Sequence, residues 1–348
     1  MKEKYVLCLP KGCGFNDVLC QINEAYKFSQ KSNRTLLIDT RLSGLADSLS
    51  NYFDLLIQDH RIQLNLKVED IDKLNKLTCF PNEFEGKIDW IYHRFEAIDA
   101  KKMDTWRYFN SIHNLLKLLF YVFKNVKLNS ISLEFKFIGN YLNLRKKKIC
   151  IQFDNIETHP AELIVHHMSG GGEESIETLS ILKLKNEIIN KINLKINFMG
   201  VDYDAIHIRN TDYKSEYATF LEQVKLKTLG RKIFLCTDNP DVIRVAKETM
   251  DQTEIVFIEK YFPRSKTNIS PTHFQWGFSK EAIHLNNINM LADLIGMAKS
   301  KNLFYPNLSE NIHQAKFSGF SLLAENLKSR PALVNQLMGG KHIAQSFN

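Results

Sequence analysis

Several features are absent or scarce in this 348-residue sequence, and each absence narrows what the protein can be. The sequence has no run of about 18 apolar residues, so we expect no membrane-spanning helix. The apolar run at residues 5–9 is too short to predict a signal peptide. Proline is scarce, with 8 residues, which argues against a linker-rich protein. None of the common nucleic-acid-binding motifs is present, and we expect no nucleic-acid partner.

The six cysteines are scattered and include no Cys-x2-Cys pair. Cys8, Cys150 and Cys236 lie within apolar runs, which favours buried thiols over disulfide bonds. Free thiols fit a reducing compartment, so we expect a cytoplasmic location. The histidines of the polar, glycine-rich segment 159–172 lack the spacing of a helical or finger-type metal site, and we expect no metal.

The composition is that of a globular protein, with 44% hydrophobic and 11% aromatic residues. The length suits two domains, at roughly 100–200 residues each. The formal net charge is +7, and the isoelectric point is near 8.9. This positive excess is mild and diffuse. It suits anionic partners such as nucleotide sugars or a lipid headgroup surface.

The second half of the chain alternates regularly between apolar runs and helical patterns. Such alternation predicts a parallel β-sheet that is covered by helices on both faces. The predicted strands are 205–209, 231–237, 253–258 and 302–305, and the predicted helices are 215–228, 240–250, 281–300 and 309–327.

The first half begins with a βαβ unit, which predicts another Rossmann-like sheet. Its strand, glycine-bearing turn, helix and second strand are predicted at 5–9, 11–17, 18–32 and 34–39. Gly12 and Gly14 lie in the turn. They either let backbone N–H groups approach an anionic ligand or form an ordinary tight turn, and the sequence leaves both interpretations open.

One long helix is predicted over residues 174–196, and it leads into the second half. We therefore expect an amino-terminal domain over 1–197, a carboxy-terminal domain over 198–327, and a helix and tail over 328–348. Residues 106–129 carry another helical pattern, with an apolar stretch followed by lysines. This pattern predicts either a buried helix or a helix that lies on a membrane surface.

Polar residues stand at the ends of the predicted strands, where open α/β sheets bind their ligands. Arg209 closes the strand 205–209, and its planar guanidinium matches phosphate, although a surface ion pair is the alternative. His207 precedes it on the same strand. Asp238 follows the next strand and either lines a ligand site or shapes a turn. Ser309 is either a helix N-cap or a phosphate ligand.

Five motifs, in this order, resemble the α-1,6-fucosyltransferases, the family that holds the bacterial nodulation enzymes and the animal enzymes of N-glycan core fucosylation. The motifs are Lys11-Gly-Cys-Gly-Phe15, Asn33-Arg-Thr-Leu-Leu-Ile38, Asp204-x2-His-x-Arg-x-Thr-Asp212, Thr237-Asp-Asn-Pro240, and Asp293 with Ser309 sixteen residues on. The resemblance spans about residues 5–325. Its most specific parts are the glycine turn with the helix and the Asn-Arg-Thr-Leu start that follow it, and the His-x-Arg strand.

The resemblance implies two Rossmann-like domains of the GT-B type that face a cleft, with GDP-fucose as donor and no required metal. It implies that Arg209 holds the β-phosphate and stabilises the charge that develops on the leaving diphosphate. It also implies that His207 and Asp293 flank the guanosine. The donor-binding residues implied in this way are Gly12, Gly14, His207, Arg209, Asp212, Asp238, Asp293 and Ser309.

An inverting transfer needs a base that deprotonates the acceptor hydroxyl. Glu216, shortly after Asp212, is the first candidate, although it is equally a solvated acid in the first turn of a helix. Asp17, across the expected cleft, is the second candidate. Asp202-Tyr-Asp204 spells a pattern that binds metal in another glycosyltransferase architecture. Because it precedes its strand, at the end away from the expected site, we interpret it as a turn.

The sequence departs from the family pattern within the strongest motif. Asn210 stands where a second arginine is usual, and Tyr213 stands where a lysine is common. Three functions therefore remain. The first is fucosyl transfer to a glycan hydroxyl, with a surface polysaccharide or lipid-linked oligosaccharide as acceptor. The others are transfer from another nucleotide sugar and a catalytically silent glycan-binding relative. Peripheral association with the inner face of the membrane is a further expectation.

Overall fold

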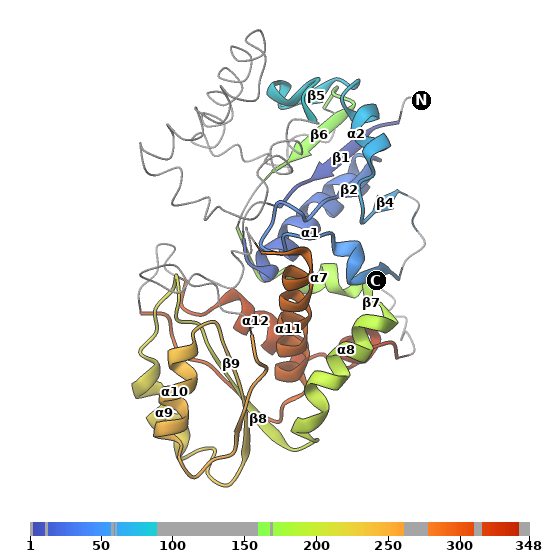
Figure 1. Cartoon of the computed structure of the whole chain (residues 1–348). Helices are drawn as coiled ribbons and strands as arrows, with labels where there is room; N and C mark the ends of the chain where they lie inside the picture. Colours follow the sequence, from blue (N-terminus) through green and yellow to red (C-terminus); the bar gives the residue numbers. More distant parts are fainter. Residues whose placement is uncertain are drawn as a thin grey trace.

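The computed structural model of the chain describes residues 3–10, 13–56, 59, 61–88, 159–167, 170–260, 278–309 and 315–340. These residues form an α/β protein with two parallel β-sheets, one in the upper half of Figure 1 and one in the lower half. The predicted fold class is therefore confirmed. The predicted helix 106–129 and Gly12 lie outside the described residues. No helix within the described ranges is long and apolar enough to cross a membrane.

The first sheet orders its strands β4-β2-β1-β6-β5, and neighbouring strands are parallel. They are β1 (Tyr5–Cys8), β2 (Thr35–Ile38), β4 (Ile62–Gln63), β5 (Cys79–Phe80) and β6 (Leu163–His166). Both faces of β1 are buried, one in a core that contains α1 (Phe15–Lys31) and the other in a core with α2 (Val68–Leu74). β1 therefore reads as an unbroken apolar run. β6 corrects the sequence analysis, which assigned no strand to the segment 159–172.

The second sheet orders its strands β10-β9-β8-β11, again all parallel. Its strands are β8 (Tyr203–Ile208), β9 (Lys232–Thr237), β10 (Ile255–Val256) and β11 (Leu303–Phe304). Helices α9 (Tyr217–Lys225) and α10 (Pro240–Thr249) pack against one face, and α11 (Lys280–Lys299) packs against the other. The strand–helix alternation predicted for this half is confirmed.

The connection between the sheets differs from the single helix predicted over 174–196. It consists of α7 (Ser175–Ser180), the short strand β7 (Leu182–Leu184), α8 (Asn186–Ile196) and η4 (Asn197–Met199). β7 pairs antiparallel with β3 (Phe53–Leu55), which follows η1 (Leu49–Asn51). Leu182 and Leu184 are buried while Lys183 is exposed, so the chain follows the alternation of a strand at this point.

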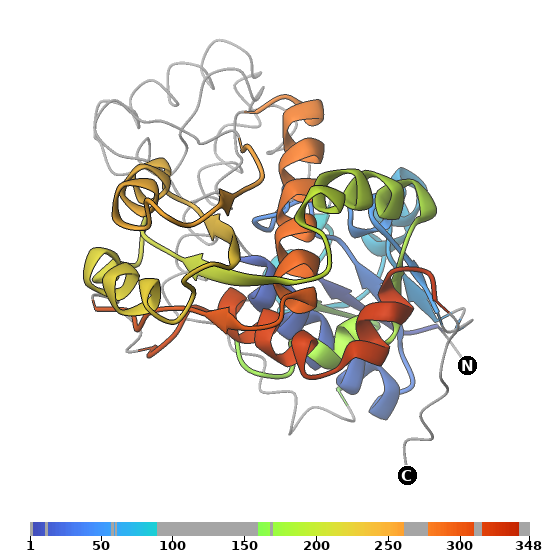
Figure 2. The ribbon, with the colours of Figure 1, turned by 90° about the horizontal axis from the view of Figure 1, so that it is seen from below.

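The inner faces of the two sheets share one continuous hydrophobic core. Helices α1, α7, α8, α11, α12 (Gly319–Lys328) and α13 (Pro331–Leu337) contribute to it. Seen from below, α11 stands between the second sheet and the helices and strands of the first half (Figure 2). Its Asn287 amide donates to the carbonyl of Leu45 at 2.8 Å and to the hydroxyl of Tyr52 at 2.9 Å. The long helix therefore holds the two halves together through polar contacts as well as packing.

Candidate active site

Arg209 follows directly after β8, whose six residues are all buried. Ile208 pairs with Thr237, the last residue of β9, so Arg209 and Asp238 follow neighbouring strands at the same edge of the sheet. This edge is the carboxyl end of a parallel sheet, where such folds bind ligands. The placement expected for both residues is therefore observed.

The guanidinium of Arg209 is held by its neighbours on the β8–α9 loop. Its Nε and Nη2 donate to the carboxylate of Asp212 at 2.8–3.0 Å, and it lies 4.6 Å from the centre of the Tyr213 ring. The side chain is only 18% exposed. Burial works against its charge, but Asp212 and Asp238 outweigh burial and raise the pKa of Arg209. Nη1 of Arg209 makes no hydrogen bond to a described residue, so its N–H groups can donate to an anionic ligand.

Asp238 fixes the loop that carries Arg209. Its carboxylate accepts hydrogen bonds from the Asn210 backbone N–H at 2.8 Å and from the Thr211 hydroxyl at 2.5 Å. The Asn239 side chain donates to the carbonyl of Asn210 at 3.0 Å. Burial raises the pKa of Asp238, and the Arg209 charge opposes that rise. The interpretation of Asp238 as a residue that shapes a turn is thus supported by its contacts.

Asp17 lies in the first turn of α1 and packs against the glycine-rich segment before α7. A Cβ at Gly171 would lie 2.1 Å from Oδ1 of Asp17, so any larger residue there would require the Asp17 side chain to move. Burial raises the pKa of Tyr213, Arg209 opposes that rise, and the charges of Asp212 and Asp17 add to it. Asp17 in the first half therefore lies within electrostatic range of the Arg209 loop in the second. Gly14 precedes α1 with an ordinary extended backbone and open space around it, so local geometry does not require glycine there.

The amino terminus of α12 lies between the two halves. His207 shares a 2.6 Å hydrogen bond with Ser321, and a Cβ on Gly319 would lie 3.0 Å from the Asn16 amide of α1. Ser318 stands at the N-cap position, and its buried hydroxyl has no hydrogen-bond partner among the described residues. Burial lowers the pKa of His207 to about 3, with Lys260 adding to the effect, so the imidazole is neutral. The unused hydroxyl and the helix N-terminus together favour an anion.

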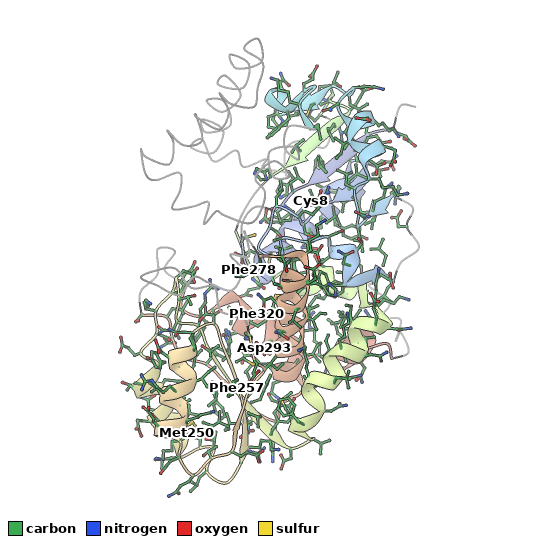
Figure 3. The ribbon with its side chains drawn as sticks, viewed as in Figure 1. Cys8, Met250, Phe257, Phe278, Asp293 and Phe320 are labelled. Atoms are coloured by element: carbon green, nitrogen blue, oxygen red, sulfur yellow. The ribbon has the colours of Figure 1, made fainter. Side chains whose placement is uncertain are left out.

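Asp293 lies on α11 and is almost fully buried. Its carboxylate forms an ion pair with Lys260, whose ammonium also donates to the carbonyl of Thr237 at 3.0 Å. Burial raises the pKa of Asp293, and Lys260 opposes that rise. Figure 3 labels Asp293 on α11 and Phe320 on the adjacent helix α12, and the Phe320 ring lies 5.5 Å from that of His207.

Three of the predicted site residues, Asp212, Glu216 and Ser309, are exposed. Glu216 immediately precedes α9 and is exposed. Ser309 is also exposed, and its backbone N–H donates to the carbonyl of Lys214 at 2.8 Å. The helix predicted from Ser309 begins instead at Gly319, and residues 315–318 are not helical. Ser309 is therefore not the N-cap of this helix.

The sequence analysis missed Ser318, Gly319 and Lys260. The first two carried a signal, because a Ser-Gly pair directly before an apolar helical pattern is typical of a helix start. The turn Pro306–Ser309 indicated an earlier helix start at Ser309 instead. Nothing local marked Lys260, since its importance depends on a partner more than thirty residues away on α11.

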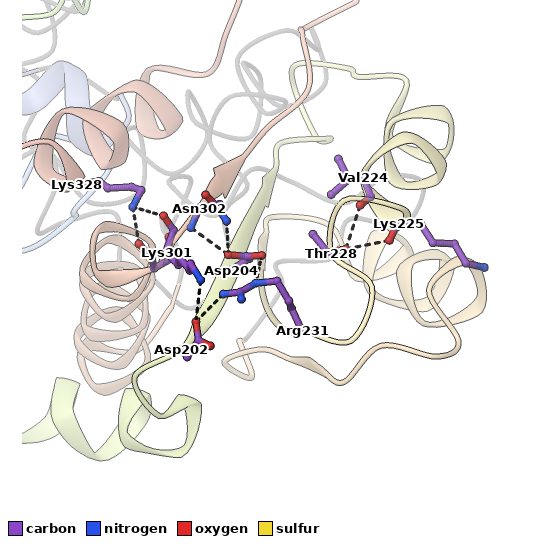
Figure 4. A network of polar contacts seen from close by, with 10 residues as sticks. Asp202, Asp204, Val224, Lys225, Thr228, Arg231, Lys301, Asn302 and Lys328 are labelled. Carbon is purple, nitrogen blue, oxygen red and sulfur yellow. Dashed lines mark hydrogen bonds and ion pairs between the residues drawn. The ribbon is translucent and has the colours of Figure 1, made fainter.

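The Asp202-x-Asp204 pair has a structural partner at the opposite end of the sheet from Arg209. Asp204 is fully buried and accepts from Nε of Arg231 at 2.5 Å and from the Asn302 amide at 2.9 Å (Figure 4). Asp202 is exposed and pairs with Nη2 of Arg231 at 2.7 Å. Both carboxylates are thus bound to an arginine.

The two-sheet arrangement is that of the GT-B fold. The chain was also compared with known sequences and with solved structures. No family model matches the sequence, and no curated protein matches it. Structures of the α-1,6-fucosyltransferase NodZ do match, one of them co-crystallised with GDP and one from Bradyrhizobium. Each has a TM-score of 0.51 and 17% identity, over 94% of this chain and 93% or 94% of the other. The chain therefore has the fold that the sequence resemblance led us to expect.

Proposed function

We propose that this protein is an inverting glycosyltransferase that transfers fucose from GDP-fucose to a hydroxyl of a glycan. The observation that carries the proposal is Arg209, a mostly buried guanidinium held by Asp212 and Tyr213 at the carboxyl edge of the second sheet. The fold shared with NodZ supports the same conclusion. We further propose that residues 198–327 bind the donor and that residues 1–197 bind the acceptor.

In this reaction the acceptor oxygen attacks C1 of fucose, and the bond from C1 to the β-phosphate oxygen breaks. The electron pair of that bond stays on GDP, so negative charge grows on the diphosphate. Arg209 and the N-terminus of α12, with Ser318, stabilise that charge in a preorganised site. The acceptor proton passes to a carboxylate, for which Glu216 and Asp17 are the candidates. Loss of one such stabilising donor costs about 2.7–4 kcal/mol in other enzymes.

The proposed nucleotide base is guanine because its N1–H and N2–H groups match a carboxylate acceptor. Asp293 supplies such a carboxylate, and one of its oxygens, Oδ1, has no hydrogen-bond partner among the described residues. His207, near the end of β8, is neutral, so it adds no positive charge that would favour a phosphate over a base in this site. The donor requires no metal in this proposal, since Arg209 meets the diphosphate directly.

The acceptor in this proposal is a surface polysaccharide or a lipid-linked oligosaccharide, modified in the cytoplasm before export. The moderate positive charge of the chain suits a peripheral association with anionic lipid. Extraction of the protein with the membrane fraction at low salt, and its release at high salt, would test this location.

A direct test incubates the protein with GDP-fucose and a panel of glycans, and measures both GDP release and labelled product. We expect Arg209→Ala to lower the rate by about 100- to 1,000-fold. The control is Arg244→Ala, because Arg244 is an exposed arginine on α10 that forms an ion pair with Glu248. Equal activity of the wild type and the Arg209 variant would contradict the proposed role.

A catalytically silent glycan-binding relative remains the second candidate, and Asn210, in place of the usual second arginine, is the observation that favours it. The two functions differ in nucleotide binding. A donor site should raise the stability of the folded protein by about 2.7 kcal/mol when GDP is at 100 times its Kd. Thermal shift measurements with GDP, UDP and CDP would separate the candidates, since a silent relative without a donor site gains nothing from any of them.

A further inference from the structure

Lys260 is a buried cation that the reaction described above does not use. Its side chain is 14% exposed, and its ammonium contacts the Asp293 carboxylate and the Thr237 carbonyl. The residue follows β10, and Asn289 of α11 donates to the adjacent Glu259 carbonyl at 3.1 Å. Lys260 is therefore fixed both through its backbone neighbour and through its side chain.

A buried ion pair of this kind contributes little to stability by itself, because desolvation of the two charges offsets their attraction. Replacement of such a pair by apolar residues of similar volume is often neutral or stabilising. The pair leaves Oδ1 of Asp293 buried and without a hydrogen-bond partner among the described residues, although the Cys236 thiol lies beside the carboxylate. An ionised carboxylate with an unused oxygen, next to the carboxyl ends of β8 and β9, is suited to a ligand that donates hydrogen bonds.

We propose that Lys260 is a positioning residue that makes the donor site selective for guanine, by holding Asp293 charged and leaving its Oδ1 for the base. The inference rests on the proposed function. Guanine offers N1–H and N2–H donors together, whereas hypoxanthine lacks the N2 amine and adenine presents an acceptor at N1. A charged carboxylate distinguishes these bases, and a protonated one does so poorly because it offers a donor of its own.

The groups around the pair determine what happens when Lys260 is removed. Cys236 on β9 and Asp238 after it add no positive charge, and His207 on β8 is neutral. After Lys260, the Cys236 thiol and then Lys195 on α8 lower the pKa of Asp293, and among the described residues both effects are smaller than that of Lys260. Without Lys260, burial would meet less opposition, so the pKa of Asp293 would rise further and the carboxylate would be protonated more readily.

The test is isothermal titration of GDP and inosine diphosphate into the wild type and variants between pH 6 and 9. The wild type should prefer GDP by about ten-fold or more, the value of one charge-assisted hydrogen bond, at every pH. Lys260→Met should lose most of this preference at pH 6 and regain it as the pH rises, whereas Lys260→Arg should retain it. Lys227→Met is the matched control, because Lys227 is exposed.

A double variant, Lys260→Met with Asp293→Asn, keeps the proposal testable if the single variant does not fold. It replaces both charges by neutral groups, and it should bind GDP weakly with no dependence on pH. The inference would be overturned if Lys260→Met kept the wild-type preference for GDP at every pH, or if it bound GDP more tightly than the wild type. Either result would leave the proposed function standing. Failure of the wild type to bind GDP would overturn the proposed function and the inference with it.

Discussion

The contact between Arg231 and Asp204 gives a stability prediction that does not depend on function. Asp204 lies in β8, an inner strand of the second sheet, and its side chain has no exposed surface. Among the described residues, Arg231 is its one cationic partner. In Arg231→Met the carboxylate keeps its hydrogen bonds from Asn302 but loses its counter-charge. Removal of one partner from a buried pair typically costs about 3–5 kcal/mol, because the remaining charge stays desolvated.

The size of this effect is large compared with the total stability of a domain, about 5–15 kcal/mol. We would measure it by urea unfolding, followed by circular dichroism, at pH 7. The control is Arg244→Met, which breaks the exposed pair with Glu248, where both side chains are 62% exposed. Exposed helix pairs of this spacing contribute about 0.3–0.5 kcal/mol, so the two variants should differ several-fold in their effect.

A second variant separates the loss of charge pairing from the loss of packing. Arg231→Met combined with Asp204→Asn removes both charges, while the new amide oxygen can still accept from Asn302. We expect the double variant to recover most of the stability that the single variant loses. If Arg231→Met costs no more than Arg244→Met, then Asp204 is not a desolvated charge and the reasoning is wrong.

Two further predictions concern the base and the dependence of stability on pH. The catalytic base is tested with Glu216→Gln and Asp17→Asn. The variant that removes the base should lower kcat by about 100- to 10,000-fold and leave GDP affinity unchanged, as measured by steady-state kinetics and calorimetric titration. An unchanged kcat in both variants would exclude both residues. Burial lowers the pKa of both His166 and His207 to about 3 in the folded protein, whereas a histidine in the unfolded chain has a pKa near 6.5. Between these two pH values, only the unfolded chain binds a proton at each histidine. Stability should therefore fall as the pH drops from about 6.5 toward 3, by up to about 1.4 kcal/mol per pH unit for each histidine; urea unfolding at several pH values measures it, and a flat profile would contradict it.

The second sheet was predictable because its strands are buried on both faces and therefore read as short apolar runs. The residues that follow β8 and β9 were found for the same reason, since the end of such a run marks the carboxyl edge. The sequence also identified Cys8 and Cys236 as buried thiols, which the structure confirms. These features depend on local pattern, and local pattern is what a single sequence records best.

Features that depend on distant partners were not predictable in this way. β7 interrupts the pattern that predicted one helix over residues 174–196. It forms because it pairs with β3, which lies more than a hundred residues earlier in the chain. β6 is a four-residue apolar run inside a polar segment, and only its place between β1 and β5 makes it a central strand. Tertiary pairing overrides helix propensity in the first case and supplies the missing signal in the second.

The replacement of the usual second arginine by Asn210 changes how the proposed site meets the diphosphate. Asn210 is buried and fastens the β8–α9 loop through its backbone N–H, its carbonyl and its side-chain oxygen. An arginine would have to leave this position to reach a ligand, and the loop would lose those bonds. Tyr213 adds no charge, but its ring supports the guanidinium of Arg209. In the proposed reaction, the leaving group would therefore depend on Arg209 and on the N-terminus of α12 for its stabilisation.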